Sequence, residues 1–311
     1  MVKCLEVSGK RANFAWLKNR DMKKLAIITG ADGCMGSEIA RAVALEGYRV
    51  IMACKNLERA KAKREWIVGE SGNNDVEIMP IDLASLKTVR AFADEILKRE
   101  EPVALLMNNS GMLEQEGRTI TEDGLERTVS VNYVGHYLLT RLLLPKMERG
   151  SRIVSMTSLT YMWGLIKFPS FFETGCRGFF WRIFPYCNSK LAITLFTLKL
   201  ARELKERGIT VNCADPGIVA TDIIYFKMWF DPITRAVFAP IIRTPRQGAA
   251  TAVWLLLSPE VAGQTGTFCL SCHVKKLKRK YTESPLIEEL WQRTEDVVRK
   301  YLSTSNPQLR A

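Results

Sequence analysis

Short apolar runs alternate with longer amphipathic segments along most of the chain, and this alternation constrains the fold more than any other feature. The apolar runs are rich in Val, Ile, Leu and Met, which is typical of buried β-strands. We expect strands at residues 25–29, 48–53, 76–81, 103–107, 152–157, 209–213 and 266–270. We expect helices at residues 35–46, 57–68, 86–99, 121–147, 185–207, 245–257 and 285–302.

The expected strands are apolar over nearly their whole length rather than at every second position. Strands of this kind are buried on both faces, which indicates a mostly parallel, seven-stranded sheet with helices on both sides. Right-handed crossover connections then give a doubly wound α/β fold. No linker divides residues 25–311, so we predict one domain there, preceded by a basic extension at residues 1–24.

The composition is that of an ordinary globular protein. Of the 311 residues, 47% are hydrophobic and 25% are charged. No run reaches the length of about 18 apolar residues that a membrane-spanning helix needs. No apolar stretch near residue 1 resembles a secretory signal. We therefore expect a cytoplasmic protein, with contact at a membrane surface left open.

Eight cysteines are scattered along the chain, several of them inside apolar runs. In a chain of this length we predict reduced, buried thiols. Residues 269–273 match the CxxCH pattern of covalent haem attachment, but they begin on the last expected strand. We therefore expect neither haem nor a metal ion.

The charge balance is basic: 45 Lys and Arg face 33 Asp and Glu, a formal net charge of +12. Such an excess suits a nucleic acid, an anionic membrane surface or a small polyanionic ligand. Two basic runs, at residues 55–64 and 275–280, have almost no aromatic residues between their cations. Because stacking aromatics are typical of single-strand nucleic-acid sites, we predict no nucleic-acid partner.

A glycine-rich turn, TGADGCMG at residues 29–36, follows the first expected strand. Glycines in such a turn let backbone N–H groups approach a pyrophosphate, and the next helix directs its positive N-terminus at the phosphates. An ordinary turn between a strand and a helix uses the same residue types, so the turn alone leaves both interpretations open.

Lys55 stands just beyond the second expected strand, where a dinucleotide-binding fold meets the adenosine ribose. An acidic residue there binds the 2′-hydroxyl, whereas a basic residue suits a 2′-phosphate. The first acidic residue after it is Glu58, so we predict NADP(H) rather than NAD(H). The alternative is a solvated lysine at the start of a helix.

Tyr186 and Lys190 are four residues apart in an expected helix and therefore share one of its faces. A lysine ammonium favours a nearby phenolate, so we expect Lys190 to lower the pKa of Tyr186 below about 10. A tyrosine tuned in this way can donate or accept a proton during hydride transfer. The pair is common by itself and gains weight from its place after the fifth strand.

These three features occur in the order found in the short-chain dehydrogenase/reductase family, which the chain resembles from about residue 24 to about residue 300. Within the family it is most similar to the branch that contains retinol dehydrogenases and the WW-domain oxidoreductase. Further matching motifs are Asp82-Leu83, NNSG at 108–111, VNYVGH at 131–136, IVSMTS at 153–158, PGIVAT at 216–221 and EELW at 288–291. The resemblance implies a Rossmann-type fold and hydride transfer between NADP(H) and a small apolar alcohol or carbonyl substrate.

The resemblance also assigns catalytic roles. Tyr186 would be the general acid or base, Lys190 would bind the nicotinamide ribose and tune Tyr186, and Ser158 would hold the substrate oxygen. Asn132 would position a water that links Lys190 to solvent. Taken singly, Ser158 could be only a strand-end hydroxyl and Asn132 only a helix kink.

The implied cofactor-binding set is spread over the ends of several strands. Asp82 would face the adenine, Asn109 the adenosine ribose and Thr221 the nicotinamide amide. The complete set is Gly30, Asp32, Met35, Gly36, Lys55, Asp82, Asn109, Tyr186, Lys190, Val219 and Thr221.

One position departs from the family pattern, and the identity of the catalytic hydroxyl leaves a choice. Cys34 stands where the family has glycine, which adds a side chain near the expected pyrophosphate, while Gly33 supplies backbone freedom one residue earlier. This departure motivates an alternative function, a dinucleotide-binding regulatory or scaffolding protein that does not catalyse. Ser155 and Thr157 lie near Ser158, but strand alternation puts both on the opposite face, so they are not equivalent to it. Ser158 is chosen by its place in the motif, with Thr157 as the fallback.

Two apolar, aromatic-rich segments lie at residues 159–185 and 222–243. At the carboxyl ends of the strands they would border the active site, so we predict a pocket and lid for the apolar substrate. Additional core, a subunit interface and shallow membrane contact are the alternatives. The long helices also resemble those that the family uses to form homodimers.

Overall fold

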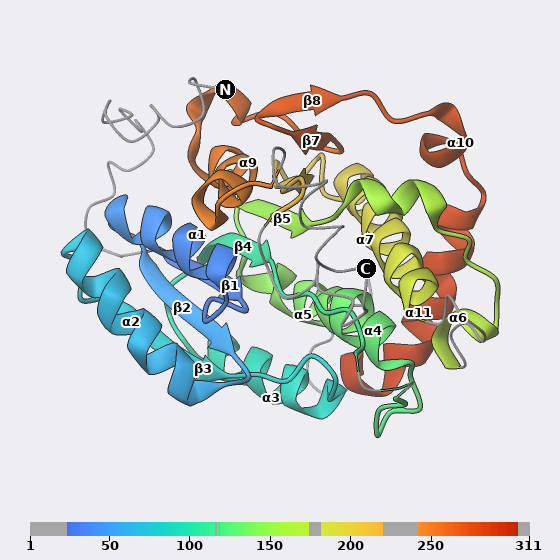
Figure 1. Ribbon diagram of the computed structural model, residues 1–311, viewed down its shortest axis with the longest axis horizontal. Helices are drawn as coiled ribbons and strands as arrows, with labels where there is room; N and C mark the ends of the chain where they lie inside the picture. The colour runs from blue at the N-terminus through green and yellow to red at the C-terminus, as the bar shows by residue number, and fades with distance from the viewer. Residues whose placement is uncertain (1–23, 116, 118, 174–181, 220–241, 304–311) are drawn as a thin grey trace.

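The computed structural model describes residues 24–115, 117, 119–173, 182–219 and 242–303. Its strands form one sheet in the order β3-β2-β1-β4-β5-β6-β7-β8 (Figure 1). All neighbouring pairs are parallel except the last, β7 with β8. The strands are β1 (Leu25–Thr29), β2 (Arg49–Cys54), β3 (Val76–Pro80), β4 (Val103–Asn108), β5 (Arg152–Met156), β6 (Thr210–Asp215), β7 (Phe268–Leu270) and β8 (His273–Lys275).

Helices cover both faces of the sheet (Figure 1). One face carries α1 (Cys34–Leu45), α2 (Leu57–Ser71) and α9 (Pro245–Leu257). The other carries α3 (Leu86–Leu97), α5 (Gly135–Leu143), α7 (Ile183–Glu203) and α11 (Leu286–Leu302). The shorter helices are α4 (Arg127–Val129), α6 (Ser170–Glu173) and α10 (Arg279–Thr282), and 3₁₀ turns lie at Leu144–Lys146, Leu159–Trp163 and Pro259–Val261.

The order of the strands reverses between β1 and β4. From β1 the chain builds outward through β2 and β3, and from β4 it builds in the opposite direction through β5 to β8. In an open parallel sheet, ligands bind in the crevice outside the carboxyl ends of the strands at such a reversal. The fold therefore directs attention to the ends of β1 and β4.

The parallel strands and the two helical layers confirm the predicted α/β fold. β8 was not predicted, because its three residues are exposed and do not form an apolar run. The helix expected at 121–147 begins only at Arg127 and contains a π-helical turn at Ser130–Val134, while Ile120 and Glu126 form an antiparallel bridge. Residues 1–23 of the predicted basic extension lie outside the described residues.

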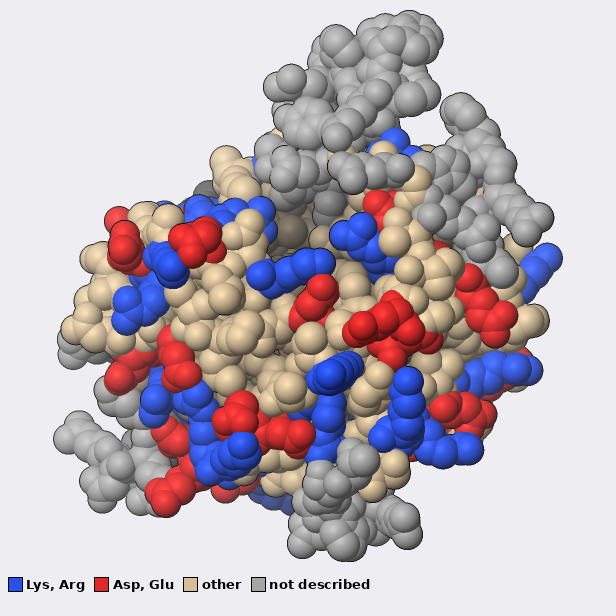
Figure 2. All heavy atoms as spheres, turned by 90° about the horizontal axis from the view of Figure 1, so that it is seen from below, with Lys and Arg blue, Asp and Glu red and all other residues tan. Residues whose placement is uncertain are grey.

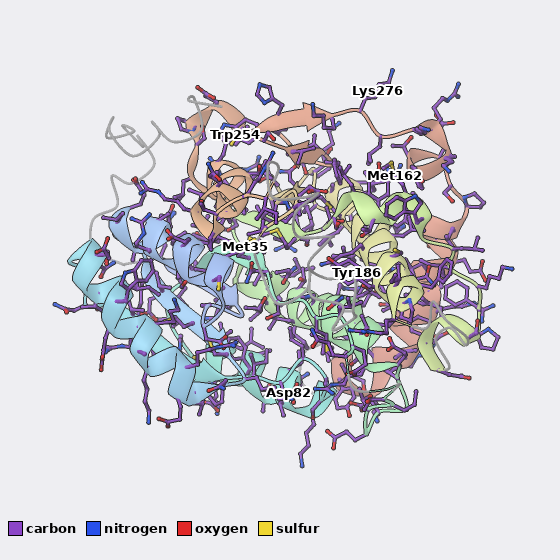
Figure 3. All side chains as sticks on the ribbon, in the orientation of Figure 1. Met35, Asp82, Met162, Tyr186, Trp254 and Lys276 are labelled. Carbon is purple, nitrogen blue, oxygen red and sulfur yellow. The ribbon has the colours of Figure 1, made fainter. Side chains whose placement is uncertain are left out.

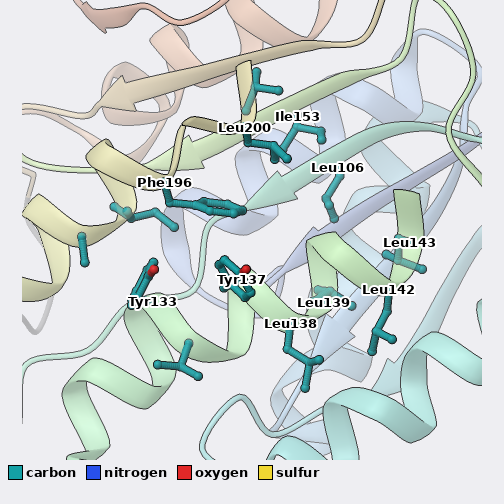
Figure 4. Close-up of a cluster of buried hydrophobic side chains, with 14 of the residues drawn as sticks. Leu106, Tyr133, Tyr137, Leu138, Leu139, Leu142, Leu143, Ile153, Phe196 and Leu200 are labelled. Carbon is teal, nitrogen blue, oxygen red and sulfur yellow. The ribbon is translucent and has the colours of Figure 1, made fainter. Parts of the chain in front are cut away.

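Aromatic side chains join three helices on the face that carries α5. The ring centroid of Tyr137 lies 5.1 Å from those of Phe196 and Trp291, which belong to α7 and α11. Figure 4 shows Tyr137 and Phe196 facing each other in this core. Helix α11 thus covers α5 and α7, the long helices that we expected could pair two subunits. A dimer through the bare faces of α5 and α7 would have to displace α11.

The cysteines are not all reduced, contrary to our prediction. Cys272 is disulfide-bonded. Among the described residues, four free thiols are buried and a fifth, Cys34, is exposed; the buried ones are Cys54, Cys187, Cys213 and Cys269.

In the described part of the chain, no helix is long and apolar enough to cross a membrane. No group of three or more His, Cys, Asp or Glu side chains there is placed to hold a metal ion.

Candidate active site

The glycine-rich turn joins β1 to α1 and leaves the start of α1 open. Gly30 has a φ of 63°, a left-handed conformation that favours glycine. A Cβ at Gly36 would overlap the carbonyl oxygen of Gly30, so only glycine allows the turn to close this tightly. No side chain caps the N-terminus of α1, and its first turn contains no acidic residue. The helix N-terminus therefore keeps the positive character that attracts phosphate groups.

Met35 and Val219 meet beside this turn although they are far apart in the sequence. A Cβ added at Gly248 would lie 2.5 Å from a methyl group of Val219 and 3.1 Å from the Met35 sulfur. Gly248 belongs to α9, which packs against α1. Both predicted cofactor-binding residues thus flank the start of α1. Thr221, predicted for the same set, lies outside the described residues.

Asn109 ties the end of β4 to the glycine-rich turn. Its backbone N–H donates to the hydroxyl of Thr29 at 2.9 Å, and its side-chain amide donates to the carbonyl oxygen of Thr29, also at 2.9 Å. The Oδ1 atom of Asn109 is buried and has no hydrogen-bond partner among the described residues. A buried acceptor without a partner is costly, so this atom is available to a hydroxyl donor such as a ribose.

Ion pairs connect side chains at the carboxyl ends of neighbouring strands, among them the predicted Asp32, Lys55 and Asp82. The Lys55 ammonium lies 2.7 Å from the Asp82 carboxylate. The Arg59 guanidinium donates to Asp32 at 2.7 Å from the first turn of α2. Arg59 was missed by our sequence analysis, although its place four residues after Lys55, one helical turn away, is a usable indication. Two cations therefore stand where an adenosine phosphate is expected.

Ser158 and Tyr186 come together at the opposite half of the crevice. Ser158 follows β5 and begins the 3₁₀ turn Leu159–Trp163, and Tyr186 lies in the first turns of α7. The Ser158 hydroxyl lies close enough to the Tyr186 phenol to lower its pKa, against the effect of burial. The hydroxyl of Thr157, our fallback for Ser158, instead lies 2.9 Å from that of Thr194 in the core, so Thr157 does not reach the site.

Burial dominates the protonation of the Tyr186 and Lys190 pair. Burial raises the pKa of Tyr186 well above its usual value of 10, and the nearby Asp215 carboxylate raises it further. Our expectation of a Tyr186 pKa below 10 is therefore wrong, because burial has the larger effect. Burial also lowers the pKa of Lys190 to about 8. The Lys190 ammonium lies 5.5 Å from the Tyr186 ring centroid and donates a 3.0 Å hydrogen bond to the Met156 carbonyl.

Asn132 lies in the π-helical turn Ser130–Val134. Its side chain accepts a hydrogen bond from the Met112 backbone N–H at 2.8 Å and donates to the Met112 carbonyl at 2.9 Å. It also donates to the Ser189 hydroxyl at 3.0 Å, next to Lys190. A Cβ added at Gly111 would contact both the Lys190 ammonium and Asn132 Oδ1, at 3.4 and 3.7 Å. Asn132 and Lys190 therefore border the same small space above Gly111.

Asp215 is a buried carboxylate in the site that our sequence analysis missed. It ends β6, is 1% exposed, and accepts a 2.6 Å hydrogen bond from the Gly217 backbone N–H. Its second oxygen, Oδ2, has no hydrogen-bond partner among the described residues. Its negative charge raises the pKa of Lys190, against the effect of burial. An acidic residue at a strand end directly before Pro216-Gly217 was the available indication.

The aromatic segment after Ser158 contributes to the core more than we predicted. Phe171 and Phe172 are buried, and the Phe171 ring centroid lies 6.1 Å from that of Tyr133. For these two residues the core interpretation is correct and the pocket interpretation is wrong. Residues 174–181 and 220–241, which include most of the other predicted pocket residues, lie outside the described residues.

Comparison with known proteins identifies the family. The short chain dehydrogenase family profile matches residues 24–172 and 174–227. The chain belongs to this family. It is 36% identical over 293 residues to human retinol dehydrogenase 14, in an alignment that covers 88% of this chain and 86% of that protein. It is 34% identical over 275 residues to human retinol dehydrogenase 13, in an alignment that covers 86% of this chain and 82% of that protein.

A solved structure agrees with this assignment. A short chain dehydrogenase from Burkholderia cenocepacia in complex with NADP superposes with a TM-score of 0.64 and 25% identity, covering 80% of this chain and 95% of that one. The chain is thus an oxidoreductase of the short-chain dehydrogenase/reductase class with an NAD(P)-binding Rossmann-type fold.

Proposed function

We propose that this protein is an NADP(H)-dependent oxidoreductase that interconverts an apolar alcohol and its carbonyl compound. The observation that carries the proposal is the placement of Ser158 and Lys190 around Tyr186, with the Lys190 ammonium 5.5 Å from the Tyr186 ring centroid. This group lies at the carboxyl end of β5, in the same crevice as the open N-terminus of α1. A proton donor and an anion site in one crevice are what reduction by a dinucleotide requires.

The residues present fit a dinucleotide. The uncapped start of α1 would hold the pyrophosphate, Asn109 Oδ1 would accept from a ribose hydroxyl, and Lys190 would bind the second ribose. When bound, the nicotinamide supplies or accepts the hydride. The exposed Cys34 thiol belongs to the first turn of α1, so its small side chain can turn outward without blocking the backbone N–H groups.

We infer a preference for NADP(H) over NAD(H) from two cations. Lys55 and Arg59 follow β2, and each has only one ion-pair partner among the described residues, Asp82 and Asp32 respectively. Both side chains are more than half exposed and can rotate toward a ligand. A 2′-phosphate would find two cationic donors there, whereas a 2′-hydroxyl would not need them.

Tyr186 is suited to act as the proton donor in carbonyl reduction. Because burial raises its pKa, the phenol stays protonated at neutral pH. Ser158 would hold the substrate oxygen and Tyr186 would donate its proton to that oxygen. A charged Lys190 would then stabilise the phenolate that remains, and Asn132 would support its reprotonation from solvent.

Exposed apolar side chains that neighbour Ser158 and Tyr186 in the sequence support an apolar substrate. Leu159, directly after Ser158, is 41% exposed, and Phe184, two residues before Tyr186, is 36% exposed. Retinol dehydrogenases 13 and 14, the relatives described above, are named for an apolar alcohol. We therefore propose a long-chain or isoprenoid-like alcohol and aldehyde pair as the substrate class.

The test is NADPH oxidation by the purified protein with a panel of apolar and polar aldehydes and ketones. We expect turnover with apolar carbonyl compounds and little with short polar ones. The alternative of a regulatory protein that does not catalyse predicts tight NADPH binding without turnover on any substrate. A protein that neither binds NADPH nor turns over would contradict both interpretations.

A further inference from the structure

Three large apolar side chains protrude from the segment that follows Ser158. Met162, Trp163 and Leu165 are 42%, 67% and 61% exposed, although neighbouring Tyr161 is buried. Exposing an indole and a leucine to this extent is unfavourable in water, and adjacent exposed apolar side chains often mark a contact surface. These residues do not belong to the group of Ser158, Tyr186 and Lys190.

A run of cations lies beside these apolar residues. Lys275 ends β8, Lys276 and Lys278 follow it, and Arg279 and Lys280 begin α10. Among the described residues, Arg279 alone of these five forms an ion pair, with Glu283. The run therefore carries a strong net positive charge.

Two contacts fix the cationic run to the apolar group. The Tyr281 hydroxyl donates to the Met162 carbonyl oxygen at 3.4 Å. The Tyr281 ring packs edge-on against Tyr161, with 5.1 Å between ring centroids. Figure 3 shows Met162 and Lys276 at the same edge of the molecule, which is remote from Asp82. We call residues 162–165 and 275–280 together the β8–α10 edge.

The charge pattern on the lower side of the molecule is different. On the lower side of the molecule, basic and acidic residues are interleaved (Figure 2). On α3, for example, Arg90 pairs with Asp94 at 2.7 Å and Lys98 lies next to Glu95. Such a mixed surface has no preference for a polyanion. The β8–α10 edge is thus distinguished by unbalanced positive charge together with exposed apolar groups.

We propose that the β8–α10 edge docks on an anionic lipid membrane. Lysines close to a lipid surface are attracted to its anionic headgroups. Tryptophan and leucine side chains insert at the boundary between headgroups and acyl chains. An acidic protein surface would pair with the cations, but it would not bury the protruding side chains of Trp163 and Leu165. Since residue 159 of the same segment directly follows Ser158, docking would bring the proposed active site near a lipid-dissolved substrate. The docking itself does not depend on the proposed activity.

The experiment is co-sedimentation of the full chain with vesicles of phosphatidylcholine alone or of phosphatidylcholine mixed with phosphatidylserine. We expect binding to the mixed vesicles that weakens as salt is added, because the attraction is screened. The double variant Trp163→Ala/Leu165→Ser and the triple variant Lys275→Glu/Lys276→Glu/Lys278→Glu should each bind at least about tenfold more weakly.

Matched controls come from α2, which carries the partly exposed Trp66 beside Lys61 and Lys63. Trp66→Ala and Lys61→Glu/Lys63→Glu should bind vesicles like the unmodified protein. Retained NADPH binding by every variant would show that each one is folded. The proposal is overturned if the mixed vesicles do not bind the protein, or if the β8–α10 variants bind as tightly as the α2 controls.

Discussion

Lys55 and Asp82 form an ion pair of 2.7 Å across the carboxyl ends of β2 and β3. We expect the two residues to bind different parts of the adenosine: Lys55 its 2′-phosphate and Asp82 its adenine. The pair holds the lysine near the cofactor crevice at little cost, because an exposed ion pair contributes at most about 1 kcal/mol. A phosphate that takes over Lys55 therefore loses little from breaking it.

Replacing Lys55 with alanine should weaken NADPH binding by about tenfold or more, because a hydrogen bond to a charged group is worth about 1.5–3 kcal/mol. The affinity for NADH should change little. Titration of each cofactor by fluorescence measures both effects. Lys61→Ala is the control, since Lys61 is 64% exposed against 63% for Lys55 and pairs with Glu58 on the same helix. An equal loss for NADPH and NADH would contradict the role of Lys55.

Tyr186→Phe should remove the proton donor while keeping the ring in place. We expect NADPH-dependent turnover to fall by about 10²–10⁴, with NADPH affinity nearly unchanged. Steady-state rates and a binding titration report the two quantities. Tyr161→Phe is the control, because Tyr161 is buried near the site and packs against Tyr281 and Phe268. Turnover by Tyr186→Phe close to that of the unmodified enzyme would exclude Tyr186 as the acid.

The pH dependence of reduction should follow Lys190. Burial lowers its pKa from 10.5 to about 8, so the ammonium is charged below that pH and neutral above it. A neutral Lys190 no longer stabilises the forming phenolate of Tyr186. We therefore expect kcat/KM for carbonyl reduction to decline as the pH rises through about 8. A profile that stays flat well above pH 8 would argue against this assignment.

Asp215→Asn tests whether the buried carboxylate acts through Lys190. Asp215 raises the pKa of Lys190, so its loss should lower that pKa and move the declining limb of the profile toward lower pH. The amide also keeps an oxygen for the Gly217 N–H, which preserves the local turn. A purely structural role would reduce stability without moving the limb. The pH profile of kcat/KM, compared with a thermal denaturation curve, separates the two outcomes.

The fold was predictable because its strands are buried on both faces. Continuous apolar runs such as Leu25–Thr29 and Val103–Asn108 leave a parallel sheet as the consistent solution. The start of the helix near residue 121 was misplaced because the sequence from 121 to 126 has helical periodicity, while a bridge between Ile120 and Glu126 takes its backbone. This bridge is local, and the Asp123-Gly124 pair, which is typical of turns, was the indication that our sequence analysis missed.

The positions of the site residues were easier to predict than their electrostatics. Ordered motifs indicated Ser158, Tyr186 and Lys190, and the structure brings the three together. The spacing of Tyr186 and Lys190 predicted a lowered phenol pKa, but burial of the ring has the larger effect in the opposite direction. Burial depends on how the whole chain packs around the site, and four-residue spacing carries no information about it. Asp215 was missed although its place directly before Pro216-Gly217 could be seen in the sequence.

Trp291→Ala should destabilise the protein by roughly 3–5 kcal/mol, which is typical of a large buried aromatic. Trp291 is 5% exposed, stacks on Phe196 and carries the Arg141 guanidinium 4.9 Å from its ring centroid. Urea denaturation measures the change, and Trp66→Ala, at 36% exposure, should cost much less. Because Trp291 holds α11 over α5 and α7, we also expect the variant to self-associate in size-exclusion chromatography. Equal denaturation midpoints for the two tryptophan variants would show that α11 is not packed on these helices.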